Sequence, residues 1–177
     1  MADWPKIEAM GECAELLERR VAIMDCKTKL ERYLRENGVP YSMHHHPPAY
    51  TAQAVAESEH VSGKIVAKVV IVFLDNTMTM LALPANLRVN FAKAGESLGG
   101  KQARLALEDE FAAAFPDCDL GAMPPFGNLY DLETIVDRQL AGAETLVFNA
   151  GTHEDTIHLK YDDFERLVRP KVTDLTA

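Results

Sequence analysis

A single lysine interrupts the most apolar stretch of the chain. Lys68 lies within residues 65–74, a run otherwise made of aliphatic and aromatic side chains. Because lysine is almost never fully buried without a partner, we expect its amine to point into a cleft or to reach solvent at the mouth of a strand. An amine on a rigid strand is suited to hold a phosphate or to orient an ester as a point charge.

A segment rich in glycine and proline could supply the other half of such a site. Residues 121–127 read Gly-Ala-Met-Pro-Pro-Phe-Gly, a composition that excludes regular structure. Gly121 and Gly127 let the backbone approach a ligand closely, whereas the two prolines remove amide donors and fix φ. The segment therefore predicts a stiff loop, which either binds a ligand or is only a rigid surface turn.

Histidines occur at two places where they could contact a ligand. His44, His45 and His46 are consecutive, and neighbours in a strand point to opposite faces, so at most His44 and His46 share one face. A third metal ligand would have to come from a distant segment, and the sequence has no His-Glu-x-x-His or Cys-x-x-Cys motif. We therefore predict a surface histidine run and no metal. His153 follows a predicted strand, where it could bind a substrate or cap the turn.

No established nucleophile motif accompanies these residues. The sequence lacks the Gly-x-Ser-x-Gly, Walker and dinucleotide-binding patterns. Its three cysteines, Cys13, Cys26 and Cys118, fit neither a disulfide framework nor a zinc-knuckle spacing. We expect them to be reduced and mostly buried thiols.

Hydrophobic spacing and helix-breaking residues predict the elements that position these side chains. Apolar residues three and four apart predict a helix in the N-terminal third, which Gly38 and Pro40 end. Further helices are expected at residues 51–59, 89–98, 108–115 and 163–168. Strands are expected at residues 39–46, 65–74, 77–83, 104–106, 134–137, 145–149 and 156–160. Since strict βαβ alternation is absent, we predict an α+β fold: a single domain with a mixed, mostly antiparallel β-sheet and flanking helices.

Composition places the chain among ordinary globular proteins. It has 177 residues, of which 47% are hydrophobic, and a formal net charge of −9. Such a charge argues against coating nucleic acid through bulk attraction. Residues 60–104 nevertheless carry six basic against two acidic side chains, which suits a small anionic group or one nucleic-acid end. We find neither a secretory signal nor a membrane-spanning run, and expect a cytoplasmic protein without membrane contact.

Six segments carry a family resemblance when they are taken together. They are Gly38-Val39-Pro40-Tyr41, residues 46–52, residues 63–72 with Lys68, Leu83-Pro84-Ala85, residues 121–127 and residues 149–153. The combination resembles the YbaK/EbsC proteins, free-standing relatives of the editing insertion domain of bacterial prolyl-tRNA synthetase. The resemblance implies a YbaK-like aminoacyl-tRNA editing domain at residues 28–177, preceded by an N-terminal helical extension at residues 1–27.

The resemblance also implies an activity and a set of functional residues. The activity is hydrolysis in trans of the ester in a mischarged aminoacyl-tRNA that carries alanine or cysteine on a prolyl-type tRNA, with no cofactor. The implied partners are the tRNA acceptor end and a prolyl-tRNA synthetase. The family's strand lysine falls on Lys68 and its Gly-x-x-x-Pro loop begins at Gly121, which implies catalytic roles for both. Implied substrate contacts are His46, Thr51, Lys64, Pro124, Pro125, Phe126, Gly127 and His153.

Two other functions stay open at this point. A non-catalytic RNA-binding or regulatory module would bind uncharged RNA with a salt-dependent affinity and no turnover. A metal-dependent hydrolase, suggested by the histidine run, would lose activity to a chelator. The sequence determines neither the amino acid removed nor the oligomeric state.

Overall fold

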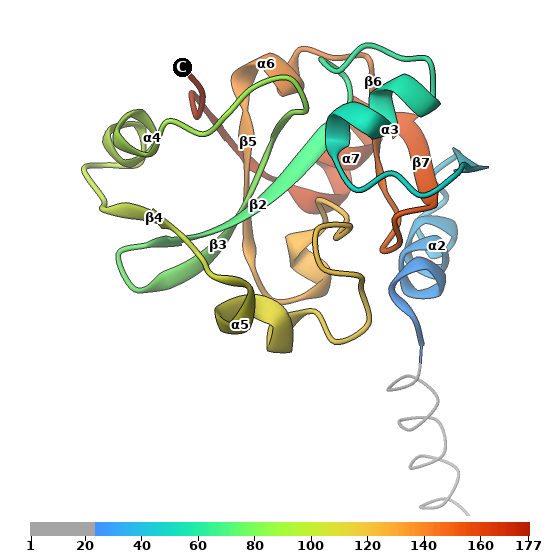
Figure 1. Ribbon diagram of the computed structural model, residues 1–177, viewed down its shortest axis with the longest axis horizontal. Helices are drawn as coiled ribbons and strands as arrows, with labels where there is room; N and C mark the ends of the chain where they lie inside the picture. The colour runs from blue at the N-terminus through green and yellow to red at the C-terminus, as the bar shows by residue number, and fades with distance from the viewer. Residues whose placement is uncertain (1–23) are drawn as a thin grey trace, which may run out of the picture.

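Two β-sheets organise the fold in the computed structural model, which describes residues 24–177 (Figure 1). The predicted N-terminal helix lies largely in residues 1–23, outside the described residues. Its described part is α2, Cys26–Glu36, in which Asp25 caps the first turn by accepting a hydrogen bond from the Thr28 amide at 3.0 Å. The expected boundary between residues 27 and 28 falls inside this helix.

The larger sheet has five strands in the order β4-β2-β3-β5-β8. Its centre is the antiparallel hairpin of β2, Ala67–Leu74, and β3, Thr77–Pro84, joined at Asp75 and Asn76. The short strand β4, Ala103–Leu105, pairs antiparallel with β2. Beyond β3, the strands β5, Glu133–Asp137, and β8, Lys171–Thr173, are parallel to their neighbours. The sheet is thus mixed, and its strand β2, which lies between β4 and β3, carries Lys68.

The smaller sheet has three antiparallel strands in the order β1-β7-β6. They are β1, Tyr41–His45, β7, Asp155–Lys160, and β6, Thr145–Asn149. A parallel bridge between Val66 and Val147 joins β6 to the residue just before β2. The end of β6 therefore lies beside the start of β2, where the two sheets meet.

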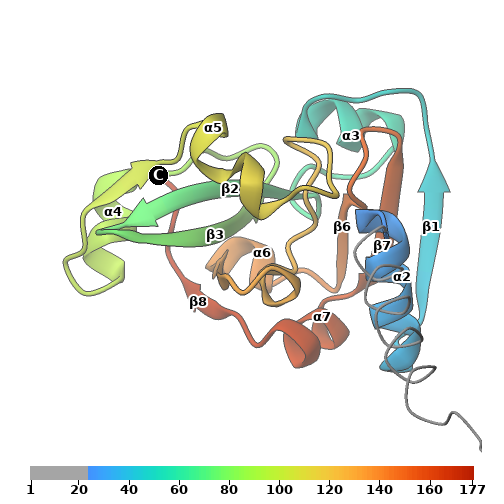
Figure 2. The same ribbon diagram turned by 90° about the horizontal axis from the view of Figure 1, so that it is seen from below.

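The helices cover the sheets and close the ends of the fold (Figure 2). Leu30 and Leu34 of α2 pack with Phe126, Phe148 and Phe164 in the largest core cluster, which covers one face of the smaller sheet. The remaining helices are α3, Ala52–Ser58; α4, Phe91–Ser97; α5, Glu108–Phe111; α6, Arg138–Ala141; and α7, Tyr161–Val168. Two 3₁₀ turns, η1 at Ala112–Ala114 and η2 at Gly127–Leu129, complete the description. Within residues 24–177, no helix combines the length and apolarity that crossing a membrane requires.

The predicted α+β fold is confirmed, with three differences in detail. The strands divide between two sheets, whereas the sequence analysis expected one. The helix predicted at residues 108–115 becomes 3₁₀ after Phe111. The elements α6 and β8 were not predicted, because four and three residues are too few to show a hydrophobic period.

Candidate active site

A cavity of about 320 Å³ opens where the start of β2 meets the end of β6. Its lining residues come from four segments of the chain: Tyr50, Thr51, Ala52, Gln53, Ala67, Lys68, Val69, Gly121, Met123 and Asn149. Lys68 and Gly121 are thus in one cavity although 53 positions separate them. Two larger hollows, of about 650 and 630 Å³, contain neither residue.

The Lys68 ammonium is held by backbone carbonyls at the edge of this cavity. Its Nζ donates to the carbonyl oxygen of Leu87 at 2.5 Å and to that of Ala85 at 3.5 Å. Both partners recorded within residues 24–177 are uncharged, so no carboxylate there neutralises the amine. Partial burial lowers the pKa of Lys68, and the nearby Arg88 guanidinium lowers it further. An anionic or carbonyl oxygen in the cavity would therefore be a favourable additional partner.

Gly121 lines the same cavity with its backbone. Its φ of +89° lies in the left-handed region, where glycine has no steric cost, and the residue is exposed. The amide donates to the Met123 sulfur at 3.2 Å. Because a thioether is a weak acceptor, a carbonyl or oxyanion of a substrate would compete well for this donor.

His153 and Tyr50 stand together at the rim of the cavity. Their ring centroids are 4.8 Å apart, and a β-carbon at Gly121 would lie 3.6 Å from the His153 Cε1. The His153 Nε2 donates to the Leu120 carbonyl at 3.2 Å. Its Nδ1 is buried and has no hydrogen-bond partner within residues 24–177. Tyr50 is 74% exposed, so its ring offers a free aromatic face beside the opening.

Asn149, the last residue of β6, is a polar lining residue that the sequence analysis did not single out. Its Oδ1 is buried without a hydrogen-bond partner among the described residues. An unsatisfied buried acceptor costs roughly 1–3 kcal/mol, so a donor from a bound molecule would be favourable here. The signal available in the sequence was a polar residue ending an apolar strand directly before a glycine turn.

The turn that follows Asn149 is fixed to the loop that carries Gly121. The Gly151 amide donates to the Ala122 carbonyl at 3.0 Å, and the Asp119 amide donates to the Gly151 carbonyl at 2.8 Å. Gly151 has a φ of +95°, and its α-carbon packs directly against Cys26 at the start of α2. These contacts hold two walls of the cavity at a set distance.

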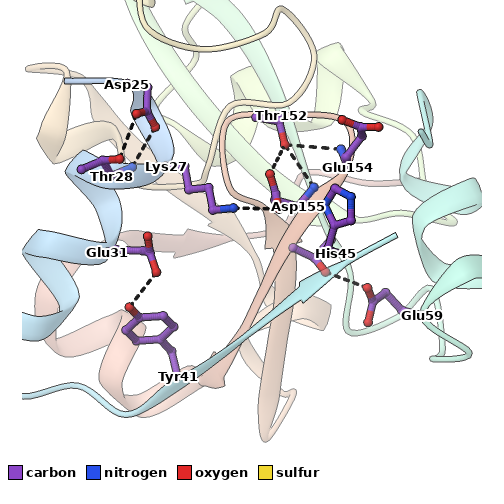
Figure 3. Close-up of polar contacts among 11 residues, drawn as sticks. Asp25, Lys27, Thr28, Glu31, Tyr41, His45, Glu59, Thr152, Glu154 and Asp155 are labelled. Atoms are coloured by element: carbon purple, nitrogen blue, oxygen red, sulfur yellow. Dashed lines mark hydrogen bonds and ion pairs between the residues drawn. The ribbon is translucent and has the colours of Figure 1, made fainter. Parts of the chain in front are cut away.

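Asp155 anchors the other end of the same turn (Figure 3). Its carboxylate accepts hydrogen bonds from the Lys27 Nζ at 2.8 Å and from the Thr152 hydroxyl at 2.8 Å, and it meets the His45 Nδ1 at 3.1 Å. Burial raises the pKa of Asp155, but the bonds from Lys27, Thr152 and His45 outweigh it and lower the pKa overall. The group therefore stays ionised and ties α2, β1 and the turn together.

Several residues for which the resemblance implied substrate contact lie away from the cavity surface. Pro124, Pro125, Phe126 and Gly127 are all buried. The Phe126 ring has no exposed surface and packs in the core, and the Gly127 amide donates to the Thr134 hydroxyl at 3.1 Å. None of these four residues lines the cavity, and they instead anchor the loop that carries Gly121.

Of three other implied contacts, Thr51, Lys64 and His46, only Thr51 lines the cavity. Thr51 lines the cavity, and its hydroxyl accepts a hydrogen bond from the Ala54 amide at 3.1 Å as the N-cap of α3. Lys64 is exposed and is not a lining residue. His46 is only 6% exposed; its Nδ1 lies 2.8 Å from the Pro47 carbonyl oxygen, and its Nε2 is buried with no hydrogen-bond partner in the described part of the chain.

The histidine run does not lie on the surface as one unit. His44 instead meets Glu59 and His158, with one ligand atom of each within 4.8 Å of the others. The sequence analysis considered His44 with His46 and did not identify this cluster, because Glu59 and His158 are 15 and 114 positions away from His44.

Comparison with known proteins identifies the family of sequences that shares this cavity region. The family model described as the aminoacyl-tRNA editing domain matches residues 46–167, a span that includes every residue lining the cavity. The prolyl-tRNA editing protein ProX of Acetoanaerobium sticklandii is 24% identical over 154 residues, which cover 82% of this chain and 92% of ProX.

Two solved structures share the fold. The crystal structure of the hypothetical protein APE2540 superposes with a TM-score of 0.75 at 23% identity, covering 84% of this chain and 99% of that one. A protein described as a candidate trans-editing enzyme for prolyl tRNA synthetase gives a TM-score of 0.73 at 19% identity, covering 88% of this chain and 99% of its own.

Proposed function

Since the chain belongs to the aminoacyl-tRNA editing domain family, we propose that it removes a small amino acid, alanine or cysteine, from mischarged prolyl-type tRNA in trans. Membership confirms the expected family and the expected class of enzyme, a hydrolase that deacylates aminoacyl-tRNA. The amino acid, the tRNA and the acting residues are the proposal. The observation that carries it is the shared cavity of Lys68, Gly121 and Asn149.

A small hydrolytic cavity suits the physical problem that editing solves. A synthetase pocket built for a larger apolar side chain cannot strongly reject a smaller one, because each methylene is worth only about 1–3 kcal/mol. A second site that admits only small groups corrects such errors. At about 320 Å³, this cavity is near the lower end of ligand-binding pockets, which span roughly 300–1,000 Å³.

In the proposed complex, the polar groups of the cavity bind the aminoacyl ester at three points. The α-ammonium of the substrate donates to Asn149 Oδ1, which has no recorded partner in the described residues. The ester carbonyl accepts from the Gly121 amide in place of the Met123 sulfur. The Lys68 ammonium holds the ester carbonyl or the terminal-adenosine phosphate as a point charge.

The chemistry then needs no protein nucleophile. Water attacks the carbonyl carbon, and the negative charge that develops on the carbonyl oxygen is stabilised by the Gly121 amide and the Lys68 ammonium. The bond to the ribose oxygen breaks, that oxygen takes up one proton of the water, and the amino acid leaves as its carboxylate while the second proton passes to the solvent. Positioning and electrostatics account for the acceleration of an ester that is already activated.

The rim of the cavity gives a place for the terminal adenine. Tyr50 is exposed and its ring lies against His153, which orients it. Unpaired bases of RNA stack on such aromatic faces. We therefore propose that the tRNA acceptor end binds at this rim. A prolyl-tRNA synthetase as a further partner and a cytoplasmic location are parts of the proposal that rest on the family alone.

A panel of charged tRNAs tests this function. Prolyl-type tRNA is charged with alanine, cysteine, serine or proline, and release of the amino acid is followed with and without EDTA. We expect release of alanine or cysteine, retention of proline and no effect of EDTA. Binding without release of any amino acid would favour the RNA-binding module, and loss of release in EDTA would favour a metal-dependent hydrolase.

A further inference from the structure

We propose that His44, Glu59 and His158 bind one divalent transition-metal ion of the zinc class, at a site separate from the editing cavity. One imidazole nitrogen of each histidine and one carboxylate oxygen of Glu59 lie within 4.8 Å of one another. None of these residues lines the editing cavity.

Strand register places the two histidines on one face of the smaller sheet. His44 of β1 pairs with Thr156 of β7, and His158 lies two residues further along β7. Paired residues and residues two apart point to the same side of a sheet. Accordingly, the two imidazole rings stack with centroids 4.2 Å apart and an interplanar angle of 27°.

Glu59 reaches this face from the end of α3, where it is the C-cap residue (Figure 3). Its Oε2 lies 2.7 Å from the His44 Nδ1 and 3.0 Å from the His158 Nε2. In a tetrahedral zinc site with bonds of about 2.0–2.2 Å, neighbouring ligand atoms are roughly 3.3 Å apart. The two histidine nitrogens would therefore need to move away from the Glu59 oxygen by only about 0.3–0.6 Å to admit an ion.

The Glu59 carboxylate is buried without a permanent positive charge beside it. Its side chain is 5% exposed, and its recorded partners within residues 24–177 are His44, His158 and the Thr156 hydroxyl. A buried carboxylate is costly unless a cation neutralises it, and a neutral imidazole does not do so. A bound divalent ion would supply that charge.

The donor set and its support favour zinc over magnesium or calcium. Two imidazole nitrogens with one carboxylate oxygen suit borderline ions, whereas magnesium and calcium prefer oxygen ligands throughout. The second carboxylate oxygen, Oε1, accepts from Thr156 Oγ1 at 2.8 Å, an outer contact that holds the ligand in orientation. Three protein ligands leave a fourth position for water.

The location of the site gives the ion a structural role. It would join the end of α3 to the strands β1 and β7. The first residues of α3, Ala52 and Gln53, line the editing cavity. A bound ion would thus hold the C-terminal end of α3, whereas the residues that line the cavity lie at its N-terminal end, so removal of the ion by EDTA should leave deacylation intact.

Metal binding to the full-length, untagged and EDTA-stripped protein tests the proposal. Isothermal titration with Zn²⁺ should show one ion per chain, and Co²⁺ should give the visible absorption of a tetrahedral site. His44→Ala and Glu59→Gln should each weaken binding at least about tenfold. His45→Ala is the matched control and should bind as the wild type does, because His45 faces Asp155 instead.

Circular dichroism of the metal-free variants establishes that they are folded; His44 is 45% exposed, so its removal should leave the core intact. Absence of stoichiometric binding by the wild type would overturn the proposal. So would equal affinity in the wild type and in the folded His44→Ala and Glu59→Gln variants.

Discussion

The turn that carries Asn149 and His153 should depend strongly on a glycine at position 151. A β-carbon added to Gly151 would lie 2.5 Å from both the Cβ and the Sγ of Cys26. The φ of +95° adds a backbone cost of about 1–2 kcal/mol for any L-residue, and overpacking adds about 1–3 kcal/mol. Gly151→Ala should therefore lower the free energy of unfolding by about 2–5 kcal/mol.

Gly38→Ala is the matched control for this substitution. Gly38 also has a positive φ, +65°, but a β-carbon there would have no atom of residues 24–177 within 4 Å. Only the backbone cost of about 1–2 kcal/mol applies. The difference between the two variants isolates the contact with Cys26.

Thermal and urea unfolding followed by circular dichroism measures both costs. At about 2–4 °C per kcal/mol for a chain of this size, Tm should fall by roughly 2–8 °C in Gly38→Ala and roughly 4–20 °C in Gly151→Ala. Gly151→Ala should also reduce deacylation below the unfolding temperature, because the turn is bonded to the loop that carries Gly121. Equal losses of stability in the two variants would refute the reasoning.

Three further predictions concern charge, binding and packing. Because the pKa of Asp155 is lowered in the folded protein, its stabilising contribution is present above pH 3.8, the unfolded value, and is lost as the pH falls through the folded pKa. The urea concentration at the unfolding midpoint should therefore depend less on pH in this acidic range for Asp155→Asn than for the wild type. Asn149→Ala should lower kcat/KM about 10- to 100-fold without lowering Tm, since its Oδ1 has no recorded partner within residues 24–177; a large fall in Tm would contradict this. Phe126→Ala should cost about 3–5 kcal/mol of unfolding free energy in a denaturant titration, as for a core ring, and a loss below 1 kcal/mol would contradict that placement.

Local patterns in the sequence were sufficient to predict most elements and the two central residues of the cavity. The interrupted apolar run predicted a strand carrying Lys68, and β2 is that strand. The Pro-Pro segment predicted an irregular, stiff loop, and the structure has one beginning at Gly121. Both predictions rest on chemistry within ten residues of sequence, where periodicity and backbone restrictions act directly.

Features that depend on distant residues could not be predicted in this way. The metal-ligand geometry of His44 requires Glu59 from a helix end and His158 from another strand. The unsatisfied acceptor of Asn149 becomes apparent only when its surroundings are known. The burial of Phe126 follows from its packing against three other aromatic rings, which the resemblance alone did not indicate.

The most direct test of the account is deacylation by a Lys68→Ala variant. Lys171→Ala is its control, because that residue is an exposed lysine on β8 and does not line the cavity. Release of alanine and cysteine from prolyl-type tRNA is measured for the wild type and both variants at equal concentrations of folded protein. The account predicts loss of release in Lys68→Ala, with an unchanged circular dichroism spectrum, and full release in Lys171→Ala. Wild-type turnover by a folded Lys68→Ala protein would contradict it.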